Sequence, residues 1–381
     1  MQIKINKRSL YAPIRYEATR PFAVSVGKAF INAAKRGEAV RQAFVGRDLL
    51  PLLKTASAKI GRENGPGPLQ SEMLNIQVFG NYQDCGKVIF DLSKVLTDTL
   101  LITDSEDIPC GEVPFPMSSF YLHFGSDSGL FHDGLNIEGA FVTRMDDRML
   151  IDLAPAGFGQ PNFLSVQIGE TLIGSPILLN EPAKPISQAL VDSITDIQAK
   201  NRMIFEQVAV VERQLEQQYG QVVRVPSPVQ SLAKMGPLLQ KSLTLIVNAM
   251  FYLAAEPEDV VEDWGSDTPD EALVNLELLR TSGKPGAIRT LENTLHNAGY
   301  SKVRYVGRKF GQSIAASQMH EATVSGRSLA VHFRRGHFRR QAYGPERSLR
   351  KTIFVAPVLV NADTGGEPLG RIYEMSEAER R

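Results

Sequence analysis

The hydrophobic pattern of this chain changes period several times, and the order of those changes most constrains its fold. Apolar residues recur near every 3.6 positions in residues 22–60, which predicts helix, and the segment GRENGPGP (61–68) ends that zone. Short apolar or alternating runs between residues 76 and 180 are separated by Gly, Asp and Pro turns, which predicts strands. These runs are Phe120–Phe124, Ala140–Thr143, Met149–Leu153 and Phe163–Ile168.

A long helix is predicted over residues 186–219, where apolar residues are spaced by threes, fours and sevens and Gly220 follows as a C-cap. A helix of this length could contact a second chain as a coiled coil, and a homodimer is left open. A core-facing helix is favoured, because no strict heptad with charged flanks is sustained.

Three further helices are predicted before the period changes again. They cover residues 238–254, a segment that begins at the capping box Thr268-Pro-Asp-Glu271 and ends near Arg280, and Ala287–Ala298, closed by Gly299. Residues 302–306, 329–335 and 352–360 are then rich in β-branched or aromatic residues, which predicts a small antiparallel sheet.

These patterns predict an α+β protein with four zones. Residues 1–65 form a basic helical N-terminal segment, 66–182 a strand-rich domain, 183–300 a helical region, and 301–381 a basic C-terminal antiparallel sheet.

Other sequence features narrow the class of protein. The N-terminus lacks the apolar core of a secretory signal, and the apolar run Leu243–Ala255 contains Asn248 and is too short for a bilayer of roughly 30 Å, so we expect a cytoplasmic protein with no membrane contact. Cys85 and Cys110 lack CxxC spacing and are predicted to be buried thiols. No phosphate-loop, dinucleotide or nucleophile-elbow motif occurs, and no cofactor or metal site is predicted.

The zero net charge is the sum of large opposite blocks. Residues 1–62 hold 13 Lys or Arg against three acidic residues, and residues 301–350 hold 11 against two. The segment Glu256–Glu277 holds nine acidic residues and no basic one. Such asymmetry indicates an anionic partner, although the acidic segment could equally cover the basic one within the same molecule.

The segment 331–348 (VHFRRGHFRRQAYGPERS) is the strongest candidate site, with two histidines, five arginines and three aromatic residues. Arginine binds phosphate or carboxylate bidentately, and imidazole transfers protons near neutral pH. A metal-independent phosphodiesterase could therefore use His332 and His337 as base and acid, with Arg335 and Tyr343 beside them.

The same segment also fits two functions without catalysis. In the first, arginines neutralise phosphates while aromatic rings stack on the bases of RNA or another single strand. The predicted contacts are Arg334, Arg335, Phe338, Arg339, Arg340, Tyr343 and Arg347. In the second, the arginines line a solvated face or a protein-interaction surface while the phenylalanines belong to the core.

The pattern H-x-x-R-G-H-x-R-x-x-x-Y-G, from His332 to Gly344, resembles the C-terminal motif of uncharacterised proteins from bacteria, phages and plasmids. The resemblance implies a mobile-element protein and no particular activity. Our leading prediction is nucleic-acid binding by the C-terminal sheet, with phosphodiesterase activity left open. The alternative is a protein-interaction or inhibitor protein of a mobile element, which acts on a host protein through its charged surfaces and the 186–219 helix.

Overall fold

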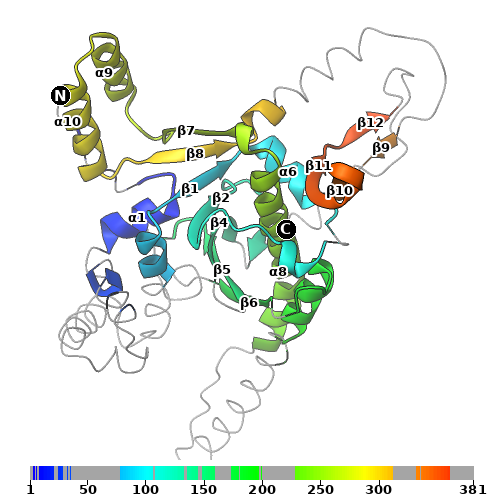
Figure 1. Cartoon of the computed structure of the whole chain (residues 1–381). Coiled ribbons are helices and arrows are strands. Elements are labelled where there is room, and N and C mark those ends of the chain that lie inside the picture. Colours follow the sequence, from blue (N-terminus) through cyan, green and yellow to red (C-terminus); the bar gives the residue numbers. More distant parts are fainter. Residues whose placement is uncertain are drawn as a thin grey trace, which may run out of the picture.

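The centre of the protein is a mixed β-sheet (Figure 1). The computed structural model describes residues 78–158, 173–199, 228–311 and 332–360, with gaps at 106–107, 133–134, 145–147, 180, 197–198 and 335, and parts of residues 3–35. Across the sheet the strands are β6 (Ile173–Leu178), β5 (Arg148–Pro155), β4 (Leu135–Arg144), β2 (Ser119–His123), β1 (Ile89–Leu92), β8 (Lys302–Val306) and β7 (Val260–Trp264), and β3 (Phe131–His132) pairs with β4. β1 is parallel to β2 and β8, and the other pairs are antiparallel.

One face of the sheet is covered by α6 (Lys94–Leu101) and α8 (Pro228–Ala255), which pack against each other. Alternate strand residues such as Phe90 and Leu122 point into this core. Asn248 is fully buried in α8, and its Nδ2 donates to the carbonyls of Leu100 and Thr103 at 2.8 and 2.9 Å, so it caps the end of α6. Among the described residues, Gly236–Ala255 is long and apolar enough to cross a membrane, and 72% of that window is buried within the protein.

The opposite face of the sheet is covered by α1 (Ala12–Thr19) and a helical segment at residues 78–84. Tyr16, Phe79 and Tyr82 pack there with sheet residues of the other alternation, including Tyr121 and Phe141. In the predicted helical zone 22–60, residues 25–28, 32 and 35 are helical, and the remainder lies outside the described residues. The helix α1 precedes that zone and lies within the predicted helical segment 1–65, although its own bounds were not predicted.

A small lobe lies at the β7 edge, where α9 (Asp270–Thr281) and α10 (Pro285–Asn297) form a helical hairpin (Figure 1). Trp264, Leu276 and Leu295 are buried in its core. Both helices match their predicted spans, but the predicted capping box is wrong: the N-cap is Pro269, and the buried Thr268 hydroxyl makes no hydrogen bond. The short 3-10 turns are η1 (Cys110–Glu112), η2 (Pro257–Asp259) and η3 (Pro345–Arg347).

The C-terminal strands form two separate pairs. β10 (His337–Tyr343) pairs with β11 (Leu349–Val355), and β9 (His332–Arg334) pairs with β12 (Val358–Val360), both antiparallel. β8 has the predicted bounds, but it lies in the large sheet instead of the small C-terminal one. The α+β class and the small antiparallel C-terminal sheet are confirmed. The predicted long helix is present at residues 186–196, and residues 200–219 and the predicted strand Phe163–Ile168 lie outside the described residues.

Candidate functional site

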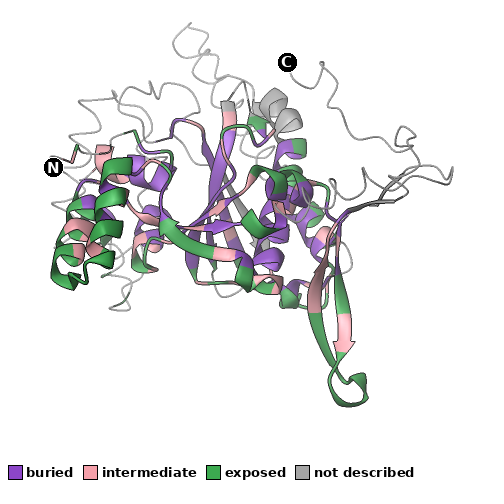
Figure 2. Ribbon diagram, turned by 90° about the horizontal axis from the view of Figure 1, so that it is seen from above, coloured by how far each residue is buried: buried purple, intermediate pink, exposed green. Residues whose placement is uncertain are grey.

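The hairpin formed by β10 and β11, here called the arm, projects from the body of the protein and is exposed toward its tip (Figure 2). Its seven residue pairs run from His337 opposite Val355 to Tyr343 opposite Leu349. Successive side chains of a strand point to opposite faces, so the register divides the arm into two faces. The inner face holds Phe338, Arg340, Ala342, Arg350, Thr352 and Phe354, and the outer face holds His337, Arg339, Gln341, Tyr343, Leu349, Lys351, Ile353 and Val355.

The inner face attaches the arm to the body. Phe338 is 7% exposed, and its ring centroid lies 5.5 Å from that of Phe251 on α8 and 5.2 Å from that of Phe354. Phe354 also packs on Tyr252 of α8 at 5.2 Å. Further along this face, Arg340 pairs with Glu112 of η1, with Nη2 and Oε1 2.5 Å apart. These contacts hold the arm in a fixed direction relative to the sheet.

The base of the arm is fixed by backbone bonds. The Asp104 amide donates to the Gly336 carbonyl at 3.1 Å, and the Phe338 amide donates to the Asp104 carbonyl at 3.0 Å. Gly336 is buried, and a Cβ there would lie 3.1 Å from both Pro357 Cδ and Thr103 Oγ1. Only glycine fits at this position unless Pro357 and Thr103 move.

The outer face carries a mixture of cationic, aromatic and aliphatic side chains. Arg339 Nη2 donates to Gln341 Oε1 at 3.2 Å, and Lys351 Nζ lies 5.8 Å from the centroid of the Tyr343 ring. Tyr343 and Leu349 face each other near the tip and are 43% and 49% exposed. Aromatic and arginine side chains presented together are typical of residues that dominate binding energy at protein interfaces.

The tip is a tight turn in left-handed backbone conformations. Gly344, Glu346 and Arg347 have φ angles of 77°, 53° and 54°. Two exposed cations, Arg347 and Arg350, lie here, and Arg350 Nη1 donates to the Arg347 carbonyl at 2.6 Å. The distal part of the arm therefore concentrates positive charge, with Glu346 as its acidic residue.

The structure separates the predicted site residues. Arg339, Tyr343 and Arg347 are exposed on the arm, and His337 is half-buried at its base, whereas Phe338 packs in the core and Arg340 pairs with Glu112. His332 and Arg334 belong to β9, but their side chains lie outside the described residues, as does Arg335 entirely. The pairing of His332 with His337 as base and acid therefore stays a prediction.

Residues of β11 on the outer face were missed by the sequence analysis. Leu349, Lys351 and Ile353 stand opposite Tyr343, Gln341 and Arg339. The dipeptide Gly344-Pro345 between two stretches of strand-forming residues is the signal that indicates a hairpin there.

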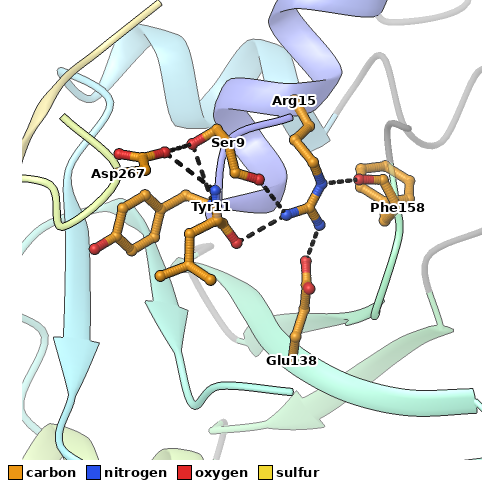
Figure 3. A network of polar contacts seen from close by, with 7 residues as sticks. Ser9, Tyr11, Arg15, Glu138, Phe158 and Asp267 are labelled. Carbon is orange, nitrogen blue, oxygen red and sulfur yellow. Dashed lines mark hydrogen bonds and ion pairs between the residues drawn. The ribbon is translucent and has the colours of Figure 1, made fainter. Parts of the chain in front are cut away.

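A second polar cluster lies on the α1 face of the sheet (Figure 3). The buried guanidinium of Arg15 donates to the carbonyls of Ser9, Leu10 and Phe158 at 2.8, 2.8 and 3.1 Å, and pairs with the buried Glu138. Burial raises the pKa of Glu138 to about 7, and Arg15 acts in the opposite direction. This cluster fixes the N-terminal segment to β4 and to the end of β5.

Next to it, the carboxyl ends of the parallel strands bring titratable groups together. Asp91 of β1 stands opposite His123 of β2 and accepts a hydrogen bond from Tyr11 Oη at 2.8 Å. Burial raises the pKa of Asp91 to about 6 and lowers the pKa of His123 to about 4, so His123 is neutral at physiological pH. Among the described residues, no group of three or more His, Cys, Asp or Glu side chains could hold a metal ion.

The acidic segment Glu256–Glu277 contacts other parts of the protein. Asp267 accepts from Asn6 Nδ2 at 3.0 Å and from the Leu10 amide at 3.1 Å, and Glu262 pairs with Arg304 at 3.5 Å. Within the described part of the chain, no ion pair joins this segment to the arm. Among the described residues, the acidic segment therefore does not pair with the positive charges of the arm.

A mixed sheet with a projecting cationic hairpin defines the protein as a member of the α+β class. Residues 90–362 match the model of the family described as AcrVA2-like: Anti-CRISPR type V subtype A2 family. The match covers well over half of the chain and includes β1 to β12, so the chain belongs to this family.

The comparison with solved structures includes a "Crystal structure of AcrVA2", to which this chain is similar with a TM-score of 0.45 and 11% sequence identity, covering 93% of this chain and 100% of that one. A search of curated proteins found no match. The family supports the predicted origin in a mobile element and favours the inhibitor alternative over nucleic-acid binding.

Proposed function

We propose that this protein is a mobile-element inhibitor of a type V CRISPR system and that it acts by binding the effector protein of that system. The observation that carries the proposal is the family match over residues 90–362, because this span includes the sheet from Phe90 onward, the helices α6 and α8, and the arm. Binding such an effector requires the inhibitor in the host cytoplasm, where we propose it works.

The geometry supports inhibition by contact. The arm is attached by an aromatic cluster and an ion pair, so its exposed side chains are held in position before any partner arrives. Preorganisation of this kind lowers the entropy cost of binding a protein. The cationic tip would also increase the association rate with an acidic surface.

The experiment that tests the proposal is a phage-plaquing assay. Bacteria that carry a type V CRISPR system and a guide against the phage are given the full-length protein from a plasmid. We expect plaquing to return to the level on bacteria without the CRISPR system, because the inhibitor removes the interference.

One control and one contradicting outcome define the result. The same plasmid in bacteria with a CRISPR system of another type should leave interference intact, which excludes a general effect on the cell. A full-length, soluble protein that leaves type V interference unchanged would contradict the proposal.

A further inference from the structure

We propose that the outer face of the arm is the docking surface of this protein and that its occupant is an acidic, apolar-floored groove on a protein partner. The inference rests on the proposed function, since the partner would be the effector or a component bound to it. It adds to that function the surface that makes the contact and the chemistry that it recognises.

The core of the protein does not use the side chains of the outer face near the tip. The core contacts of the arm are made by Phe338 and Phe354 of the inner face, and its ion pair by Arg340. On the outer face Tyr343 and Leu349 remain 43% and 49% exposed although they stand opposite each other. An exposed apolar pair at the end of a rigid projection gains stability when a partner covers it.

The charge of this surface is not neutralised within the described residues. Arg339 and Lys351 of the outer face and Arg347 of the tip are exposed, and none of them makes an ion pair with an acidic side chain there. The acidic segment Glu256–Glu277 contacts β8 and the N-terminal residues instead. The complement of this surface is therefore a groove with an acidic rim.

The apolar side chains of the outer face favour a protein over a nucleic acid as the partner. A single-stranded nucleic acid binds along a row of exposed aromatic rings, each stacking on one base. Here Phe338 is buried and Phe354 faces the core, so Tyr343 is the exposed aromatic residue of the arm. Leu349 and Ile353, which share its face, offer no stacking surface but fit an apolar protein pocket.

The test measures binding of purified type V effector to the immobilised full-length protein by biolayer interferometry. Two arm variants separate the contributions: Tyr343→Ala/Leu349→Ala removes the apolar pair, and Arg339→Glu/Lys351→Glu reverses the charge. The matched control is Val274→Ala/Leu278→Ala, because these α9 side chains are each 59% exposed on the other lobe.

We expect each arm variant to weaken binding by about tenfold or more, and the control to stay within about twofold of wild type. The affinity of Arg339→Glu/Lys351→Glu for the effector should also change less than that of the wild type between about 50 and about 200 mM salt. Unchanged far-ultraviolet circular dichroism and unfolding curves would show that the variants are folded.

The outcomes separate the two proposals. If the wild type inhibits the CRISPR system but the arm variants bind as well as the control, the docking inference is wrong and the proposed function stands. If the wild type neither inhibits nor binds, the proposed function fails. If guide RNA alone binds as tightly as the effector does, the inference is overturned in favour of a nucleic acid. Self-association at low salt that the arm variants abolish would overturn it in favour of a second copy.

Discussion

Glu138 is buried because β4 contains a bulge at this residue, where the register with β5 shifts between Ile137 and Gly139. A bulge redirects a side chain that regular alternation would place elsewhere, and here the carboxylate meets Arg15. The neighbouring Gly139 allows this arrangement, since a Cβ there would lie 2.2 Å from Tyr121 Oη. Arg15, Glu138 and Gly139 thus act together to attach α1 to the sheet.

The Arg15 contacts lead to the first prediction. Arg15→Met should lower the free energy of unfolding by about 3–5 kcal/mol, because it leaves a buried carboxyl and three carbonyls without their donor. Urea denaturation followed by circular dichroism measures the change. Glu138→Gln, which keeps an acceptor for Arg15, should cost less, and an Arg15→Met variant within about 0.5 kcal/mol of wild type would contradict the role given to the cluster.

Asp152 on β5 leads to a prediction about pH. Burial raises its pKa to about 7, so between the unfolded value of 3.8 and about 7 the folded state holds a proton that the unfolded state has lost. Its contribution to stability is fully present below pH 3.8 and is lost as the pH rises through about 7. The expected total is on the order of 4 kcal/mol.

The variant Asp152→Asn tests this linkage. The difference in unfolding free energy between variant and wild type should shift in favour of the variant as the pH rises from about 4.5 to about 8. Asp91 and Glu138 titrate in both proteins and cancel in the difference. A difference that is constant over this range would show that Asp152 is ionised in the folded protein throughout.

At the scale of elements, the arm depends on the close approach at its base. Gly336→Ala places a methyl group 3.1 Å from Pro357 Cδ and Thr103 Oγ1, so these neighbours at the base of the hairpin must move by a few tenths of an ångström. We expect faster amide hydrogen exchange in residues 337–355 and weaker partner binding, with the exchange of β1 and β2 unchanged. Exchange in the arm equal to that of wild type would show that the base tolerates the methyl group.

The sequence predicted elements whose signal is local. β8 and the helices α9 and α10 were found because period, helix ends and turn residues lie within a few positions of each other. The partner of Arg15 is 123 residues away and depends on a bulge, so no local pattern could indicate it. β10 lies between the predicted strands 329–335 and 352–360 and was not itself predicted, because its arginines hide the alternation that its pairing with β11 reveals.

At the scale of the whole molecule, the acidic segment Glu256–Glu277 and the cationic arm lie in different places. The acidic α9 lobe sits at the β7 edge of the sheet, while the arm projects from the far side of α8 (Figures 1 and 2). The sequence showed both blocks but could not show whether they meet. Their separation leaves the cationic arm available to a partner, and its positive charge favours encounter with an acidic surface.

Phage plaquing tests the function and the role of the arm most directly. The bacteria carry a targeting type V CRISPR system and express, at equal levels, the wild type, the Tyr343→Ala/Leu349→Ala variant or the Val274→Ala/Leu278→Ala control. We expect the wild type and the α9 control to restore plaquing, and the arm variant to leave interference intact. Continued interference in cells that contain folded wild-type protein would contradict the function, and full inhibition by the arm variant would contradict the role of the arm.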